Sequence, residues 1–407
     1  MASRSPILTA VLAGDLCSGC GLCAGVSDGA VELQLAAPGF LRPRQRAPLS
    51  ERQEALVAGC CPGVTVARWD QAAPAMDVAW GPYRRILTGH ACDAAIRHIG
   101  SSGGMLTALA RFALETGRVD AVVAVRAGGE GAPLANDMAV IDDPDALRDA
   151  AGSRYGPSAP LERVGALLAD PRRFLFIGKP CDVSALRRLG EHDARVGMRF
   201  PIMLSFFCGG VPSQKGSEAV IAAMGLAPAE VVRFRYRGNG WPGKARAETR
   251  DGHSAEMDYA TCWGGHLSKH VQFRCKICPD AVGGVADIAC ADAWFGGESG
   301  YPEFEDRDGR SLVVVRTQAG ESLLDAAMAA GVAATAPSSV AQVDLMQPSQ
   351  RKRKTLVRAR TAAIAATLQP RPRFRGVAVR RAAREAPFRD QLRNFLGTAW
   401  RIIKRRK

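Results

Sequence analysis

Short apolar runs alternate with helical patterns along the middle of the chain. Residues 121–125, 174–177 and 201–207 are runs rich in Val, Ile, Leu or Phe, which is typical of buried strands. Between the second and third runs, Asp182 can cap a helix that Gly190 can end. A strand, a helix and a further strand joined by short connections predict a parallel unit of an α/β fold.

A helix is also predicted before the first of these strands. Ser101 and Ser102 can cap it, and Gly117 can end it. Apolar residues recur between them at helical spacing, namely Met105, Leu106, Leu109, Phe112 and Ala113. The helix start, Ser101-Ser102-Gly103-Gly104, offers small residues and free N–H groups. These suit a phosphate group, for example one of the two in a flavin dinucleotide. Most such starts serve only as caps, so this pattern alone is weak.

The end of the chain is predicted to form an amphipathic helix with basic flanks. Between residues 388 and 403, apolar side chains fall on one helical face: Phe388, Leu392, Phe395, Leu396, Ala399 and Ile403. Basic residues take much of the rest, and basic runs stand at 351–354 and 404–407. Two interpretations stay open. The tail is either an interfacial helix on anionic lipid, or a solvated basic extension that can dock an acidic partner.

The distribution of charge changes how the basic composition is interpreted. The 407 residues include 54 basic and 40 acidic ones, a formal charge of +14. Residues 351–407 hold 19 of the basic and 2 of the acidic residues, which leaves 35 and 38 in the first 350. The body is therefore close to neutral, which argues against nucleic-acid binding because phosphate recognition uses a basic face. No apolar run approaches the roughly 20 residues that cross a bilayer.

Twelve cysteines are the most informative part of the composition. A chain of this length does not need disulfides for stability, and residues 1–19 show no convincing signal peptide. Reduced cysteines in a reducing, cytoplasmic compartment indicate metal ligands or redox centres.

The first cysteine motif is Cys17-x2-Cys20-x2-Cys23. Glycines make the turns that let three thiolates face one cubane, and a fourth thiolate arrives from elsewhere, as in ferredoxin-type [4Fe–4S] sites. Structural zinc more often uses two separated pairs, so the triple spacing favours iron–sulfur. Cys61, which precedes a proline as in ferredoxins, is the favoured fourth ligand, and Cys60 stays open as the alternative.

A second set of cysteines is spread over the middle of the chain. Cys181 and Cys208 each follow the end of a predicted strand. If these strands are parallel neighbours, their carboxyl ends lie about 4.8 Å apart, at the edge where open α/β sheets bind ligands. The helix that starts beside Cys181 would stabilise its thiolate through the helix dipole. Cys275 and Cys278 can complete a four-thiolate site, which zinc would fit equally well.

Other motifs are less specific. Asn239-Gly240-Trp241-Pro242-Gly243 is a tight turn that carries an aromatic ring, and such turns are more often structural than functional. His253, His266 and His270 are available as general acids, but a histidine is more often a surface or structural residue. No catalytic acid or base is therefore assigned.

Taken together, the motifs resemble those of the coenzyme F420 hydrogenase/dehydrogenase beta-subunit (FrhB) family. They occur in the family's order between about residues 84 and 300. The blocks are Ser102-Gly103-Gly104-Met105, Gly152-Ser153-Arg154-Tyr155, Lys179-Pro180-Cys181, residues 207–213, residues 236–243, Cys275-Lys276-Ile277-Cys278-Pro279-Asp280, residues 286–288 and Asp292-Ala293-Trp294. Each block is modest alone, and the combination is specific.

The resemblance implies an iron–sulfur flavoprotein that binds FAD and one or two [4Fe–4S] clusters. It implies that Cys181, Cys208, Cys275 and Cys278 hold an inner cluster. It implies flavin contacts at Ser101, Ser102, Gly103, Gly104, Lys179, Asn239, Gly240 and Trp241, although Lys179 stands where the family often has leucine or threonine. Family members reduce coenzyme F420 or act on chlorophyll-type substrates, and others lie beside surface-polysaccharide functions.

The sequence therefore predicts an α/β protein of four parts. These are a ferredoxin-like [4Fe–4S] segment (1–75), a flavin-binding FrhB-type region (84–165), a region with the inner cluster (166–340) and a basic helical tail (341–407). We expect a cytoplasmic oxidoreductase that links a ferredoxin-like partner through two clusters and FAD to a small organic acceptor, with peripheral contact of the tail at the inner membrane surface left open as one of its two interpretations. This acceptor is coenzyme F420-like, a tetrapyrrole or a polysaccharide-pathway substrate. The alternatives are an electron-transfer subunit without its own substrate and a zinc-bearing nucleic-acid-binding protein.

Overall fold

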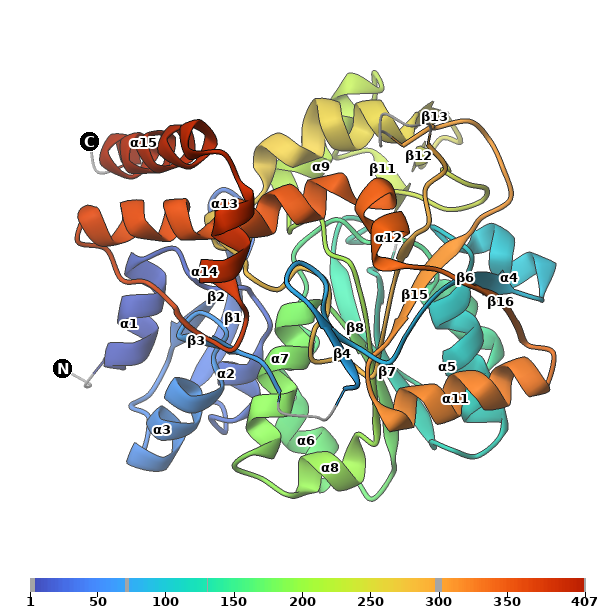
Figure 1. The fold of residues 1–407 in the computed structure, drawn as a ribbon, viewed down its shortest axis with the longest axis horizontal. Helices are drawn as coiled ribbons and strands as arrows, with labels where there is room; N and C mark the ends of the chain where they lie inside the picture. Colours follow the sequence, from blue (N-terminus) through green and yellow to red (C-terminus); the bar gives the residue numbers. More distant parts are fainter. Residues whose placement is uncertain (1–3, 70–72, 130, 297–301, 406–407) are drawn as a thin grey trace.

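A mixed sheet of eight strands forms the centre of the protein (Figure 1). The computed structural model describes residues 4–69, 73–129, 131–296 and 302–405. In this part of the chain, the strand order across the sheet is β16 (Ala333–Pro337), β6 (Arg85–Ala91), β15 (Ser311–Val315), β14 (Ile288–Asp292), β10 (Ile202–Phe206), β9 (Phe174–Gly178), β7 (Ala121–Ala127) and β8 (Asn136–Ile141). β7, β9, β10 and β14 are parallel neighbours, and the other pairs are antiparallel. The predicted α/β class is confirmed.

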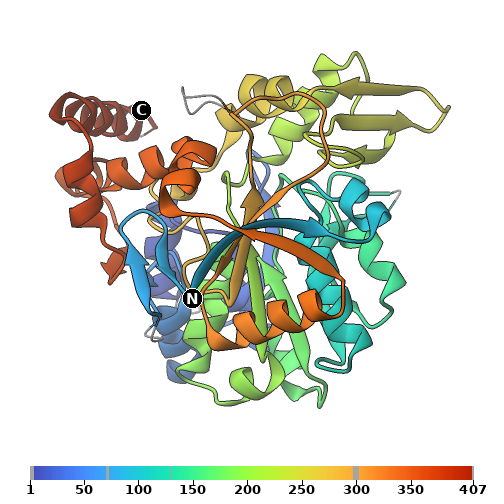
Figure 2. The same cartoon turned by 45° about the vertical axis from the view of Figure 1, so that its right-hand side comes forward.

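Alternate residues of the central strands face opposite sides of this sheet. Val122 and Leu175 pack with α5 (Met105–Glu115) and α11 (Gln318–Ala329), whereas Val123 and Phe176 pack with α6 (Val164–Ala169) and α7 (Pro180–Gly190). α8 (Arg195–Arg199) lies beside α7, and Figure 2 shows α11, in orange, in front of the sheet. Because both faces are covered, the parallel strands are continuous apolar runs rather than alternating ones.

The three predicted strands are confirmed as β7, β9 and β10, but both predicted helix starts were wrong. α7 begins at Pro180, whose fixed φ suits the first helical position. Asp182 therefore lies inside the helix, where its carboxylate accepts a hydrogen bond from Lys179 N at 2.9 Å. α5 begins after Gly104, which has a φ of +72° and makes no side-chain cap. Neither Ser101 nor Ser102 caps α5.

Smaller elements surround the central sheet. The N-terminal segment contains α1 (Pro6–Ala13), α2 (Leu22–Gly25), the hairpin of β1 (Val31–Ala36) and β2 (Phe40–Gln45), α3 (Glu51–Cys60) and β3 (Thr65–Ala67). β4 (Ala75–Asp77) and β5 (Gly81–Tyr83) form a second hairpin, followed along the chain by α4 (Ala94–Ile99). A three-stranded sheet of β11 (Val231–Arg235), β12 (Ala245–Thr249) and β13 (Ser254–Met257) lies between α9 (Gln214–Ala223) and α10 (Phe273–Lys276) in the sequence.

The basic tail folds back on the body. It contains α12 (Val340–Met346), α13 (Pro348–Ala366), β17 (Arg373–Arg375), α14 (Val379–Ala382) and α15 (Phe388–Arg405). β17 pairs in parallel with β3, so the tail is tied to the N-terminal segment. In the described residues, no helix combines the length and the apolar character that crossing a bilayer requires.

Candidate functional site

The carboxyl ends of the parallel strands meet at one edge of the central sheet. Cys181 lies in the first turn of α7, directly after β9, and Cys208 lies two residues beyond β10. β9 and β10 are parallel neighbours, as predicted. β6 runs in the same direction as β14 because both are antiparallel to β15. Its carboxyl end meets the loop before α5, where Ala91 N donates to Gly103 O at 2.7 Å.

Four thiols gather in the N-terminal segment and are called the outer thiol set: Cys17, Cys20, Cys23 and Cys61. Gly19 and Gly21 turn the loop with φ values of +76° and +86°, which glycine adopts readily. Cys61 follows α3 directly. Burial is the largest cause that raises the pKa of Cys20, Cys23 and Cys61. Neighbouring thiols of the same set raise these pKa values further, so the four thiols lie close together.

Cys60 lies apart from the outer thiol set. Its side chain is fully buried. Burial raises its pKa to about 12, and the charges that then act on it come from Arg188, Glu191 and Cys61 rather than from the thiols of residues 17–23. Of the two alternatives left open by the sequence, the structure places Cys61 with the C-x2-C-x2-C motif.

Four further thiols form the inner thiol set: Cys181, Cys208, Cys275 and Cys278. Cys275 lies in α10, and its sulfur accepts a hydrogen bond from Val211 N at 3.4 Å. Cys208 N donates to Ala281 O at 2.8 Å, which ties the loop after β10 to the loop after α10. Burial is the main cause of the raised pKa of Cys181 and of Cys208. The charges of Cys208 and Cys275 add to it at Cys181, and those of Cys275 and Cys278 add to it at Cys208.

Burial dominates the electrostatics at Cys181. It raises the pKa of this thiol well above its ordinary value, and Asp182 raises it further. The stabilisation of a thiolate by the start of α7 stays a prediction. Lys179 lies beside this thiol with its ammonium 2.8 Å from Asp182 and 2.7 Å from Ser158 Oγ. Although burial opposes its charge, Asp182 and Cys181 raise its pKa.

Residues 272–275 join the two thiol sets. Gln272 Nε2 donates to Ser18 O at 3.4 Å, beside the outer set, and lies 3.5 Å from Cys275 Sγ. Arg274 is 2% exposed, and its Nη2 donates to Pro62 O at 2.9 Å. Although burial opposes its charge, the thiols of the inner set raise the pKa of Arg274. The charge of Arg274 also acts on Cys17 and Cys61, so this guanidinium lies between the two sets.

Both sets consist of thiols, the donors that iron–sulfur clusters and structural zinc share. No group of three or more His, Cys, Asp or Glu side chains among the described residues is close enough to hold one metal ion. Zinc, with bonds of about 2.3 Å, would draw the sulfurs to within about 4 Å of one another. Four irons and four sulfides between the thiolates would hold the sulfurs farther apart than one zinc ion would. The buried Nε of Arg274 also lacks a hydrogen-bond partner in the described structure, as expected beside a bound group that supplies an acceptor.

The loop before α5 uses most of its polar groups within the fold. Ser101 Oγ accepts a hydrogen bond from Ser153 N at 2.5 Å. Ser311 Oγ bonds to both Ser102 Oγ and Gly103 N at 2.9 Å. A Cβ on Gly103 would lie 2.7 Å from the carbonyl oxygen of Gly89, so close approach to β6 requires glycine here. A flavin contact at residues 101–104 stays a prediction.

The loop of residues 236–243 is anchored by a buried ion pair. Arg237, 1% exposed, bonds both carboxylate oxygens of Asp292 at 2.7 and 2.8 Å, and Trp241 Nε1 donates to the same carboxylate at 2.8 Å. Although burial opposes its charge, Asp292 raises the pKa of Arg237. The ring of Trp241 stacks on Trp294, with ring centres 4.9 Å apart. Gly240 N donates to His98 O at 2.9 Å, which brings this loop to the end of α4.

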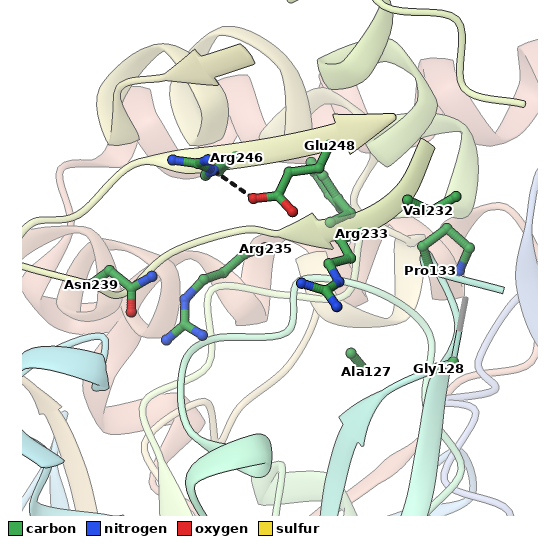
Figure 3. A pocket seen from close by; sticks show the side chains of 11 residues that line it. Ala127, Gly128, Pro133, Val232, Arg233, Arg235, Asn239, Arg246 and Glu248 are labelled. Carbon is green, nitrogen blue, oxygen red and sulfur yellow. Dashed lines mark hydrogen bonds and ion pairs between the residues drawn. The ribbon is translucent and has the colours of Figure 1, made fainter. Parts of the chain in front are cut away.

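Asn239 lines a pocket of about 520 Å³ between the end of β7 and the pair β11–β12 (Figure 3). Arg233, Arg235 and Arg246 also line it. The guanidinium of Arg246 is paired with Glu248 at 2.9 Å, and that of Arg235 donates to the carbonyl oxygens of Arg237 and Ile99. The side chain of Arg233 has no hydrogen-bond or ion-pair partner in the described part of the chain. The pocket therefore presents one unpaired guanidinium, that of Arg233, which suits an anionic ligand. Of the residues predicted to contact flavin, Asn239 alone is among those that line this pocket.

Sequence reasoning missed the groups that connect these parts. Arg274 is adjacent to a cysteine of the inner set, and that position was the available signal for it. Arg237 and Asp292 each lie in a motif, but nothing in the spacing shows that they pair across 55 residues. The tail contacts were also missed: Arg353 donates to Cys208 O at 2.8 Å, and Lys354 donates to Pro279 O at 2.5 Å.

Comparison with known proteins bears on these features. Residues 86–164 match the family model for the N-terminal part of the coenzyme F420 hydrogenase/dehydrogenase beta subunit, and residues 171–341 match the model for its C-terminal part. The chain belongs to this family. It is 26% identical over 265 residues to the coenzyme F420 hydrogenase subunit beta of Methanothermobacter thermautotrophicus, covering 63% of this chain and 85% of that protein.

Other members of the family are similar to a comparable degree. The F420-dependent formate dehydrogenase 1 subunit beta of Methanococcus maripaludis is 27% identical over 235 residues, which cover 58% of this chain and 57% of that protein. A chain in the F420-reducing [NiFe] hydrogenase complex of Methanosarcina barkeri has the same fold, with a TM-score of 0.55 and 21% identity, over 72% of this chain and 96% of that one. The relatives are oxidoreductases or subunits of them, which supports an oxidoreductase role.

The Arg237–Asp292 pair should carry much of the stability of this edge. Asp292→Asn leaves a buried guanidinium without its carboxylate, and we expect a loss of about 3 kcal/mol in the free energy of unfolding. Urea unfolding followed by tryptophan fluorescence measures it. Asp325→Asn is the control, because its pair with Arg85 is half exposed and should cost less than about 1 kcal/mol. Equal losses in the two variants would contradict the anchoring role.

Proposed function

We propose that the protein is an iron–sulfur flavoprotein oxidoreductase that exchanges electrons between a ferredoxin-like partner and a small organic acceptor. The outer thiol set would hold one [4Fe–4S] cluster and the inner set a second, with FAD at the carboxyl edge of the sheet. Such groups supply one-electron transfer at the clusters and hydride transfer at the flavin. The observation that carries the proposal is the gathering of two four-thiol sets on either side of residues 272–275.

The protein's own residues would hold and tune these groups. Cys17, Cys20, Cys23 and Cys61 would ligate the outer cluster. Arg274 supplies a buried positive charge to both sets and so favours their anionic, ligated form. Gln272 fixes the outer loop against Cys275. These contacts keep the two sets next to each other in a site from which water is largely excluded.

The arginine-lined pocket is the best-supported place for the diphosphate of FAD. It lies beyond the carboxyl end of β7, in the kind of crevice where open α/β sheets bind nucleotides. Arg233 and Arg235 extend from β11 into it (Figure 3), and Asn239 places the predicted flavin loop at its rim. Lys179 would act on the inner cluster rather than on FAD, because its ammonium faces Cys181 and Asp182.

An electron-transfer subunit without its own substrate is the second candidate, because one similar chain belongs to a hydrogenase complex. The zinc-bearing nucleic-acid-binding alternative is disfavoured by the near-neutral charge of residues 1–350 and by the C-x2-C-x2-C spacing. A cytoplasmic location agrees with reduced thiols.

An assay of the isolated chain separates enzyme from subunit. Supplied anaerobically with reduced viologen, the protein loaded with clusters and FAD should reduce coenzyme F420 catalytically, because the flavin lies in the same chain as both clusters. Removal of FAD should abolish the activity. If the protein takes up electrons but passes none to coenzyme F420, a tetrapyrrole or a nucleotide sugar, the subunit function is favoured.

Iron analysis tests the ligand assignment. The protein purified anaerobically should be brown and hold about eight irons per chain. Cys61→Ser should lower this to about four, because the outer cluster loses a ligand that no neighbour replaces. Cys60→Ser is the matched control and should keep the full iron content. Loss of iron in Cys60→Ser with retention in Cys61→Ser would reverse the assignment, and zinc in place of iron would refute the proposal.

The potential of each cluster should depend on Arg274. Arg274→Gln removes a buried positive charge that stabilises the more negative, reduced clusters. We expect both midpoint potentials to fall by about 60 mV or more, a tenfold change in a one-electron equilibrium. Redox titration followed by electron paramagnetic resonance measures the shift. Arg118→Gln, an exposed arginine on the connection after α5, should leave both potentials unchanged, and a fall in only one would place Arg274 at that cluster alone.

A further inference from the structure

α15 is attached to the body by one of its faces. It packs along α13, where Gln391 Nε2 donates to Thr355 O at 3.0 Å and Asn394 Oδ1 accepts from Arg360 at 3.0 and 3.1 Å. Ile402 is buried with apolar residues of the N-terminal segment and of α10. The helix is therefore held in a fixed position and does not hang free in solvent.

The opposite face of α15 is apolar and exposed. Five of the twelve large apolar side chains that the described residues expose lie on this one helix: Phe388 (80%), Leu392 (45%), Leu396 (56%), Trp400 (60%) and Ile403 (52%). They are spaced by four, four, four and three residues, so they form one stripe along the helix. A soluble domain scatters such residues singly and seldom gathers them into a patch.

Basic side chains flank this stripe. At 100° per residue, Arg389, Arg393 and Lys404 lie on one border of it, away from α13. The acidic residue Asp390 also lies in α15. Its carboxylate is 3.9 Å from Arg389 and neutralises one positive charge at most. The ammonium of Lys404 lies 5.0 Å from the ring centre of Trp400, which places cation and ring side by side. Residues 406 and 407, which end the basic run, lie outside the described residues.

We propose that α15 lies flat in the headgroup region of an anionic lipid bilayer, with its apolar stripe toward the acyl chains. An apolar stripe, a cationic border and a tryptophan ring at that border are the features that such interfacial helices combine. The charge of the tail complements anionic lipid: residues 351–407 hold 19 basic and 2 acidic residues. This surface belongs to the tail, outside residues 86–341 that match the family models, and it is independent of the proposed electron transfer.

Two other occupants agree less well with the surface. An acidic protein would pair with the arginines but would leave the stripe of five apolar side chains without a matching surface. A second copy of this chain would cover the stripe, but it would bring two strongly cationic tails together, and like charges at such an interface are repulsive. A bilayer with anionic headgroups satisfies both the stripe and the charge.

Vesicle sedimentation with the full-length protein tests the proposal. The protein should bind vesicles of equal parts phosphatidylglycerol and phosphatidylcholine at least tenfold more tightly than vesicles of phosphatidylcholine alone. Leu396→Ser/Trp400→Ser should weaken binding to the anionic vesicles at least tenfold. The matched control is Leu35→Ser/Met198→Ser, which removes two equally exposed apolar side chains (52% and 58%) from β1 and α8. It should bind as the unsubstituted protein does.

The folding of each variant is checked by its unfolding midpoint, which should not change because the substituted side chains are exposed. Unchanged binding of the Leu396→Ser/Trp400→Ser variant would overturn the proposal. A dimer in analytical ultracentrifugation that this variant dissociates would assign the stripe to a second copy. Equal binding to polyglutamate and to anionic vesicles, abolished for both at about 1 M salt and unaffected by the stripe substitutions, would assign the tail to an acidic partner.

Discussion

Arg274 is buried between two groups of buried thiols, and the arrangement of the whole site depends on how its charge is accommodated. A guanidinium removed from water is costly unless anions or acceptors surround it. Within the described residues it has one carbonyl partner, Pro62 O, and thiols on both sides whose own burial raises their pKa. Neutral thiols leave this charge poorly compensated, whereas ligated thiolates would compensate it. A buried arginine beside neutral thiols is energetically unfavourable. The same arginine beside thiolates that ligate an anionic cluster would be compensated, so the site is suited to hold such clusters.

The central sheet explains why residues so distant in the sequence meet. Parallel strands direct the loops after β9, β10 and β14 to one edge, and β6, which runs the same way, adds the loop before α5. The strand ends and the segments that follow them bring the elements of the site together: Cys181, Cys208, Asp292 and Gly103. The helices on both faces bury the strands, so the positions of these loops are fixed by the apolar core rather than by the loops themselves.

The C-terminal extension also contributes to the site. α13 donates hydrogen bonds from Arg353 and Lys354 to carbonyl groups next to Cys208 and Cys278, beyond the end of the family match. These carbonyls would otherwise be buried without partners, or open to water. α13 is thus part of the shell around the inner thiol set, while α15 extends its exposed surface away from it.

The sequence by itself determined the α/β class, the strands β7, β9 and β10, the C-x2-C-x2-C loop and the amphipathic character of α15. These follow from local patterns, since apolar periodicity and cysteine spacing are properties of short segments. It placed the starts of α5 and α7 wrongly, because Gly104 stands at the N-cap of α5 and Pro180 takes the first position of α7, so that Asp182 accepts from Lys179 N within the first turn. The sequence favoured Cys61 over Cys60 but left both open, and the grouping of Cys61 with residues 17–23 appears only in the tertiary structure. The Arg237–Asp292 pair was decided by tertiary structure alone. So was the position of Arg274 between the thiol sets. Each of these depends on which side chains lie together after the chain has folded, and no short-range pattern in the sequence encodes that.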